Sequence, residues 1–213
     1  MPKNIAFLHY IANYTDGVSL EMNKWRRVLE EMGHRTWYIA GQFEHDPEIV
    51  IEEMYHHRPD ARLLDHNTFK ALSDYPDERV YRSELYRLAE AIETKLRAFL
   101  ETQPIDLLIP QNVLSVAVNP AVAIAVARVI RAYRIPTLAH HHDFYFERVG
   151  GFALTNASAV EMCEKYLPPR GSRLRHVVIN SLAQRELSER KGIRATIVPN
   201  VFDFDAPDWE VDD

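Results

Sequence analysis

Asn4-Ile-Ala-Phe-Leu-His-Tyr10 is a short apolar run at the start of the chain, and Arg35-Thr-Trp-Tyr-Ile-Ala40 is a second one. A polar loop, residues 11–18, follows the first run, and a helical pattern that ends at Gly33 follows the loop. The apolar residues of this pattern recur at the i, i+3, i+4 and i+7 spacing of one helical face: Trp25, Val28, Leu29 and Met32. The order strand, helix, strand predicts two parallel strands, because the helix can return the chain to the same end of the sheet.

The same alternation of short strands and amphipathic helices continues through the second half of the chain. Pro76 suits the first turn of a long helix, on which Glu93 and Arg97 have the i, i+4 spacing of an ion pair. One face of this helix is apolar: Leu85, Leu88, Ile92, Leu96 and Phe99. Further strands are predicted at residues 106–109, 137–140, 177–180 and 196–198, with helices at residues 120–133, 157–166 and 182–191.

The predicted fold class is α/β, a doubly wound, Rossmann-like parallel sheet. Helices that alternate with strands cover both faces of such a sheet. The strand cores Leu107-Leu-Ile109 and Val177-Val-Ile179 are apolar throughout, which is typical of burial on both faces. Gly41 is expected to end the second strand, and the irregular residues 42–75 are expected to form loop, a short helix and one strand near residues 62–64.

The composition is that of an ordinary folded domain, with 46% hydrophobic and 26% charged residues. No apolar run approaches the ~20 residues that cross a bilayer, and the N-terminus lacks the layout of a signal peptide. The single cysteine, Cys163, cannot form an internal disulfide and is expected to be an inert buried thiol, so a cytoplasmic location is expected.

The formal net charge of −6 comes from the end of the chain. From residue 203 onward there are six acidic residues and no basic one, so the other 25 acidic residues balance the 25 lysines and arginines. A balanced main body does not indicate a nucleic-acid partner, and none is expected.

Candidate functional residues follow the predicted strands, because ligands of doubly wound sheets bind beyond the carboxyl ends of the strands. The first such loop is Thr15-Asp16-Gly17-Val18-Ser19. A glycine before a helix lets backbone amides approach an anion, although Asp16 or Ser19 could instead serve only as the helix N-cap. The G-x-G-x-x-G fingerprint is absent, which argues against a dinucleotide-dependent dehydrogenase.

The second candidate is His140-His141-His142-Asp143, at the end of a predicted strand. Neighbouring residues of a strand point to opposite faces, so only His140 and His142 share a side. Two ligands without a third do not make a zinc site, and no metal is expected. A histidine here could hydrogen-bond a sugar hydroxyl, or it could serve structurally by bonding to backbone.

Two polar pairs, Gln111-Asn112 and Asn180-Ser181, each follow an apolar strand. Asparagine and glutamine present both donors and acceptors, which suits sugar hydroxyls. The same residues are common in turns and helix caps, and Ser181 is expected to cap the helix that follows it.

The order of these segments resembles the N-terminal half of glycosyltransferase family 4. That family has a glycine-bearing loop after the first strand, similar to residues 15–19, and a mid-domain strand that ends in a histidine motif, similar to His142-Asp143. It later has a strand ending in serine and one ending in Pro-Asn, similar to Val177-Val-Ile-Asn-Ser181 and Ile197-Val-Pro-Asn200. Two departures are the single Gly17 in place of a glycine pair and Val201 in place of the family's glycine.

The resemblance implies one half of a GT-B fold and the retaining transfer of a sugar from a nucleotide-sugar donor to an acceptor, without a metal or other cofactor. Residues 1–202 would form the acceptor-side domain, and residues 203–213 would begin an acidic linker to a missing C-terminal domain. That missing domain would hold the nucleotide, so the chain alone is expected to be catalytically incomplete. The acceptor would be a sugar, a lipid or another small molecule, with peripheral membrane contact left open.

By the same resemblance, His142 would contact the donor sugar, with Asp143 supporting the histidine, and Gly17 would lie near the diphosphate. The expected substrate-binding residues are Asp16, Gly17, Val18, Asn112, Asn180 and Ser181. Two alternatives remain at this stage: a stand-alone α/β domain that binds a sugar or small molecule, and half of another GT-B enzyme such as a nucleotide-sugar epimerase.

Overall fold

The computed structural model describes residues 1–148 and 151–200, and these form one seven-stranded sheet. All strand pairs are parallel, in the order β3-β2-β1-β4-β5-β6-β7. The strands are β1 (Asn4–Ala12), β2 (Arg35–Phe43), β3 (Ile49–Val50), β4 (Leu107–Pro110), β5 (Thr137–His141), β6 (Leu174–Val178) and β7 (Ala195–Ile197). The strand order reverses between β1 and β4, which confirms the predicted doubly wound parallel sheet.

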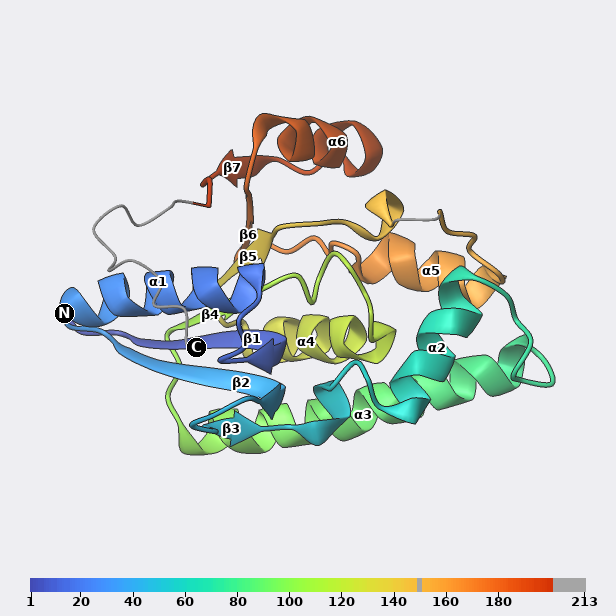
Figure 1. Cartoon of the computed structure of the whole chain (residues 1–213), viewed down its shortest axis with the longest axis horizontal. Coiled ribbons are helices and arrows are strands. Elements are labelled where there is room, and N and C mark those ends of the chain that lie inside the picture. Colours follow the sequence, from blue (N-terminus) through green and yellow to red (C-terminus); the bar gives the residue numbers. More distant parts are fainter. Residues whose placement is uncertain (149–150, 201–213) are drawn as a thin grey trace, which may run out of the picture.

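Helices cover both faces of the sheet (Figure 1). The helices are α1 (Gly17–Glu31), α2 (Pro59–Phe69), α3 (Glu78–Thr102), α4 (Pro120–Tyr133), α5 (Ala157–Tyr166) and α6 (Ser181–Lys191), with short 3-10 turns η1 (Glu52–Met54) and η2 (Tyr145–Glu147). In Figure 1 the strands follow one another from β3 near the bottom to β7 near the top. α1 packs on one face of the sheet, and α2, α3, α4 and α5 pack on the other. Within the described residues, no helix combines the length and the apolar character needed to span a membrane.

The main core lies between the sheet and the layer of α2, α3, α4 and α5. The predicted apolar face of α3 is buried there, with Leu85, Leu88, Ile92, Leu96 and Phe99 each at most 7% exposed. Each such side chain contributes on the order of 2 kcal/mol by leaving water. The predicted ion pair on α3 is also present, since Nη2 of Arg97 lies 2.6 Å from Oε1 of Glu93.

The face that α1 turns toward the sheet differs from the predicted one. Trp25 and Leu29 pack against the core beside Met22, but Val28 and Met32 are 49% and 66% exposed. The helix begins at Gly17, much earlier than the apolar pattern suggested. The side chains that it turns toward the sheet are Met22, Trp25 and Leu29, which recur at helical spacing. The predicted cap at Gly33 is confirmed, because this glycine follows the helix with a φ of 85°.

The strand predicted near residues 62–64 is wrong, because this segment belongs to α2. Pro59 stands in the first turn of that helix, and Ala61, Leu64 and Thr68 recur on its buried face at helical spacing. The next helix, α3, also begins later than expected: Asp77 caps it by accepting from the amides of Arg79 and Val80, so Pro76 lies outside the helix.

Gly41 does not end β2, which continues to Phe43. A Cβ atom at this position would lie 2.0 Å from the backbone nitrogen of Tyr55, so the glycine is needed where the turn after η1 crosses the strand.

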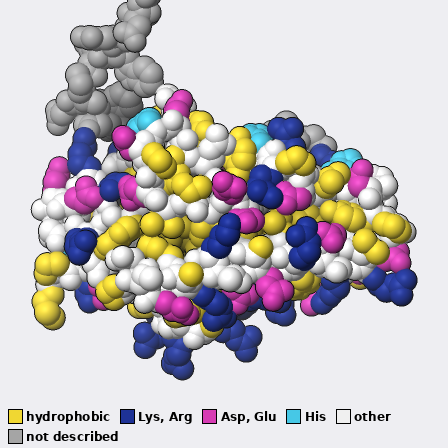
Figure 2. All heavy atoms as spheres, turned by 90° about the horizontal axis from the view of Figure 1, so that it is seen from below, with side chains coloured by type: hydrophobic (Ala, Val, Ile, Leu, Met, Phe, Trp, Pro, Cys, Tyr) yellow, Lys and Arg dark blue, Asp and Glu magenta, His cyan; other side chains and the backbone are white. Residues whose placement is uncertain are grey.

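Most other predicted boundaries agree with the structure within one to three residues, and α4 and α5 agree at both ends. Acidic and basic side chains are interspersed over most of the face shown in Figure 2, as expected for a balanced main body. The six acidic residues from position 203 onward lie outside the described residues.

Candidate functional site

Polar side chains converge at the carboxyl ends of β1, β4 and β5, where the strand order reverses. His9 lies near the end of β1, Gln111 and Asn112 follow β4, and His142 follows β5. All four are buried, with exposures between 0% and 8%. Such a switch point is where doubly wound sheets bind their ligands, and we name these four residues the switch-point cluster.

His142 has a hydrogen-bond partner on each ring nitrogen. Its Nε2 lies 2.9 Å from Oε1 of Gln111, and its Nδ1 lies 3.2 Å from Nδ2 of Asn200. An amide oxygen can only accept and an amide nitrogen can only donate, so this arrangement fits a neutral ring with its hydrogen on Nε2. Burial lowers the pKa of His142, although Asp143, Glu21 and Asp16 each favour the charged form. The ring therefore presents an acceptor at Nδ1.

Asn112 holds the corner of the chain that carries His142. Its Oδ1 accepts from the backbone amide of His142 at 2.7 Å and from that of Asp143 at 3.3 Å, while its Nδ2 donates to Oδ2 of Asp143 at 3.3 Å. Its own amide donates to the carbonyl of His140 at 2.9 Å. The residue adopts a φ of 57°, which asparagine tolerates better than most side chains. The hydrogen bonds of the Asn112 side chain are therefore made within the protein, to His142 and Asp143.

His9 joins the cluster through the backbone of Gln111, and sequence reasoning missed it. Its Nδ1 lies 2.8 Å from the carbonyl oxygen of Gln111, so Nδ1 carries the hydrogen and Nε2 is left as an acceptor. Burial lowers the pKa of His9 to about 4, against the opposing effects of the Gln111 bond and of Asp16. The one available signal was a histidine inside an otherwise apolar strand.

The loop between β1 and α1 brings an acidic side chain close to these histidines. Asp16 caps α1, since its Oδ1 accepts from the amides of Val18 and Ser19 at 2.9 and 3.1 Å. Among the described residues its Oδ2 is buried without a hydrogen-bond partner. The structure therefore confirms the capping interpretation of Asp16 and also places its charge where it affects His9 and His142.

Gly17 is the first residue of α1, and Val18 follows it within the helix rather than in a loop. A Cβ atom at Gly17 would meet nothing within 4 Å, so no packing contact requires the glycine. The amide of Gly17 donates none of the capping bonds, which come from Val18 and Ser19. Gly17 is exposed and begins the helix, so the backbone amides of this first turn and the positive end of the helix dipole are a favourable place for an anion.

The three adjacent histidines separate as predicted. The His140 and His142 rings lie on one side, with ring centres 4.3 Å apart, and His140 also stacks on Trp25 at 4.8 Å. His141 lies against His176 with 2.9 Å between Nε2 and Nδ1. Residues 1–148 and 151–200 contain no group of three or more His, Cys, Asp or Glu side chains that could hold a metal ion.

Asn180 and Ser181 lie at the start of α6, after β6. Asn180 is the N-cap, because its Oδ1 accepts from the amide of Ala183 at 2.8 Å, and Ser181 is the first helical residue. The prediction that Ser181 caps this helix is therefore wrong by one residue. No hydrogen bond joins either residue to His142 in the part of the chain that the structure describes, so their proposed substrate contact stays a prediction.

The irregular segment 42–75 brings another histidine toward the switch-point cluster. The ring of His56 lies 5.7 Å from that of Tyr10, whose other neighbour is His9 at 5.3 Å. Burial, followed by the influence of His57 and His9, lowers the pKa of His56 to about 4. A neutral, partly buried imidazole with aromatic neighbours suits hydrogen bonding and stacking with a sugar.

No family model matches the sequence. The chain is 39% identical over 209 residues to a mannosylglucosylglycerate synthase from Petrotoga mobilis, covering 98% of this chain and 47% of that protein. This chain is also 34% identical over 203 residues to a protein of the same name from Thermotoga maritima, covering 95% of this chain and 46% of that protein. A solved structure, the glycosyltransferase SnogD from Streptomyces nogalater, matches 98% of this chain and 55% of its own chain at 12% identity, with a TM-score of 0.48. The chain is thus similar over nearly its whole length to mannosylglucosylglycerate synthases, and it spans about half the length of these relatives.

Proposed function

We propose that this chain is the acceptor-side half of a glycosyltransferase that moves a sugar from a nucleotide-sugar donor to a small acceptor. The observation that carries the proposal is the 39% identity to a mannosylglucosylglycerate synthase across 98% of this chain. The switch-point cluster supports it, because neutral histidines and an exposed helix N-terminus lie at the edge of the sheet where a donor and an acceptor would meet. The other half of the GT-B fold would bind the nucleotide of the donor.

The names of the relatives make the proposal more specific. Mannosylglucosylglycerate contains a mannosyl group, a glucosyl group and a glycerate, so a synthase of this compound would join mannose to glucosylglycerate. We propose nucleotide-linked mannose as the donor and glucosylglycerate as the acceptor. The acceptor is small, polar and anionic, and the imidazoles of His9 and His56 offer donors and acceptors of hydrogen bonds for its hydroxyls.

In the proposed reaction the donor's diphosphate lies at the N-terminus of α1. The backbone amides of the first turn, which begins at Gly17, and the helix dipole there stabilise the negative charge that grows on the leaving diphosphate. No metal or other cofactor takes part. A donor-sugar hydroxyl displaces Asn200 and donates to Nδ1 of His142, whose tautomer Gln111 has already fixed. The transfer retains the configuration at the anomeric carbon.

The test begins with the coding sequence beyond Asp213. If the frame continues, the whole protein is assayed with guanosine- and uridine-linked sugars and glucosylglycerate, following release of nucleoside diphosphate and the anomeric configuration of the product by NMR. The expected result is acceptor-dependent release with retained configuration. Inversion would overturn the retaining mechanism, and the absence of transfer to any small acceptor would overturn the function.

Two further measurements separate the parts of the proposal. In the whole protein, His142→Ala should lower turnover by a factor on the order of 10² or more, with only a small change in melting temperature. The 213-residue chain alone should bind nucleotide-sugars weakly, because the proposed nucleotide site lies in the other half. Unchanged turnover would remove His142 from the site, and micromolar binding of nucleotide by the chain alone would contradict the proposed division of labour.

A further inference from the structure

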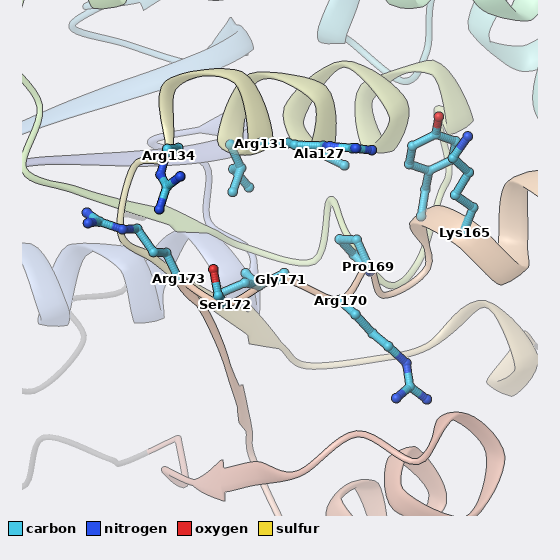
Figure 3. Close-up of a pocket in the computed structure, with 12 residues that line it drawn as sticks. Ala127, Arg131, Arg134, Lys165, Pro169, Arg170, Gly171, Ser172 and Arg173 are labelled. Carbon is cyan, nitrogen blue, oxygen red and sulfur yellow. The ribbon is translucent and has the colours of Figure 1, made fainter.

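A cavity of about 500 Å³ lies near the amino ends of β5 and β6, whereas the switch-point cluster lies at the carboxyl ends of the strands. Its walls come from the C-terminal ends of α4 and α5 and from the segment that leads into β6 (Figure 3). Five of its lining residues are basic and none is acidic: Arg131, Arg134, Lys165, Arg170 and Arg173. We call this cavity the basic pocket.

One of these five cations is already engaged elsewhere. Figure 3 shows the Arg170 side chain turned away from α4, and its Nη2 donates to the carbonyl of Lys191 at the end of α6. Arg134 and Arg173 lie near each other at one end of the pocket in Figure 3, and Lys165 lies at the other end. No carboxylate pairs with Arg131, Arg134 or Arg173 in the described part of the chain, whereas Arg26, Arg82, Arg97, Arg128, Arg148 and Arg190 each have a carboxylate partner.

Helix dipoles account for only part of this charge. Arg131 and Lys165 stand in the last turns of α4 and α5, where cations offset the negative helix ends. Two helix ends amount to about one negative charge in total, against four positive side chains, counting Arg134 and Arg173. Arg173 belongs to the segment before β6 and to no helix. The pocket keeps a clear excess of positive charge, and like charges held together favour the binding of an anion.

We propose that the basic pocket binds a phosphate-bearing ligand, separately from the sugar-transfer site. Guanidinium groups match phosphate oxygens with paired hydrogen bonds, and two of them face the same end of the pocket. The Ser172 hydroxyl and the backbone of Gly171 also line the pocket and add uncharged hydrogen-bonding groups. The volume exceeds that of one phosphate, so the ligand carries a larger body, either as a free phosphorylated compound or as a phospholipid headgroup.

The test uses two probes on the 213-residue chain. Inorganic pyrophosphate is titrated by calorimetry at low ionic strength, and vesicles of phosphatidylcholine with phosphatidylglycerol are tested by co-sedimentation. The double variant Arg134→Gln/Arg173→Gln removes the two cations at one end of the pocket. The matched control is Arg35→Gln. Arg35 is an exposed arginine at the amino end of β2, so it lies at the same end of the strands as the pocket.

The expected result is binding of at least one probe that weakens about tenfold or more in the double variant and less than about twofold in the control. Binding should also weaken as salt is added. Pyrophosphate binding would identify a free phosphorylated compound, and binding of vesicles alone would identify a lipid headgroup. The absence of binding to both probes, or an equal loss in Arg35→Gln, would overturn the proposal. Because all three arginines are exposed, thermal unfolding should show that each variant stays folded.

Discussion

The side-chain oxygen of Asn112 lies 2.7 Å from the backbone nitrogen of His142, 30 residues further along the chain. This bond joins the loop after β4 to the loop after β5 and holds the backbone from which the His142 ring projects. A residue that sequence reasoning assigned to the substrate is therefore tied to the scaffold. We infer that Asn112 acts on the substrate through the position of His142.

Removal of the Asn112 side chain should destabilise the chain. Asn112→Ala leaves the amides of His142 and Asp143 without their acceptor and places alanine at a φ of 57°. We expect a loss of about 2–4 kcal/mol in the free energy of unfolding, measured in urea. Asn112→Gly serves as the control, because it removes the same acceptor but relieves the backbone strain, and it should recover about 1 kcal/mol. A loss below about 0.5 kcal/mol in Asn112→Ala would show that the bond contributes little.

Gln111 should set the tautomer of His142. In Gln111→Leu the Nε2 hydrogen loses its acceptor, so nitrogen NMR of the His142 ring should change from one neutral tautomer to a mixture. Gln111→Glu keeps an acceptor oxygen and should preserve the single tautomer, while the added negative charge raises the pKa of His142. An unchanged ring spectrum in Gln111→Leu would contradict this role.

Stability should fall as the pH falls below about 6.5. Burial lowers the pKa values of His9, His56 and His176 to about 4 and that of His140 to about 3. These rings stay neutral in the folded chain but are protonated in the unfolded chain below their ordinary pKa, so the unfolded state binds more protons. Each such histidine removes up to about 1.4 kcal/mol per pH unit between pH 6.5 and its folded-state pKa.

The measurement is urea unfolding at a series of pH values from 7 to 5. His140→Phe is the informative variant, because His140 is fully buried and neither ring nitrogen has a hydrogen-bond partner among the described residues. This variant should lower by about one the number of protons taken up on unfolding, which sets the slope of stability against pH. It should not destabilise the chain at pH 5. A stability that does not change between pH 7 and pH 5 would show that these rings titrate normally.

Two glycines should respond differently to alanine. In Gly41→Ala the new Cβ would collide with the backbone of Tyr55, and we expect a loss of about 3 kcal/mol or more. In Gly17→Ala the Cβ meets open space, so stability should change by less than about 1 kcal/mol. In the whole protein, Gly17→Ala should still weaken binding of the nucleotide-sugar, since the methyl group occupies the space proposed for the diphosphate. Normal donor binding in Gly17→Ala would remove that residue from the proposed site.

The sequence alone determined the fold class and most elements, because helices and strands impose periods of 3.6 and 2 on their own apolar residues. It placed the α3 face, the bounds of α4 and α5, and the alternation from which a parallel sheet follows. It also placed His142 and Gly17 at the carboxyl edge of the sheet, since every parallel strand ends there.

Tertiary structure alone decided which polar groups meet at that edge. His9 and Gln111 are 102 residues apart in sequence, and they meet because β1 lies beside β4. The same order of strands commits Asn112 to the His142 backbone, and the packing of α1 on the sheet leaves Val28 and Met32 exposed. No local period encodes such contacts, because they depend on which distant strands and helices become neighbours when the chain folds.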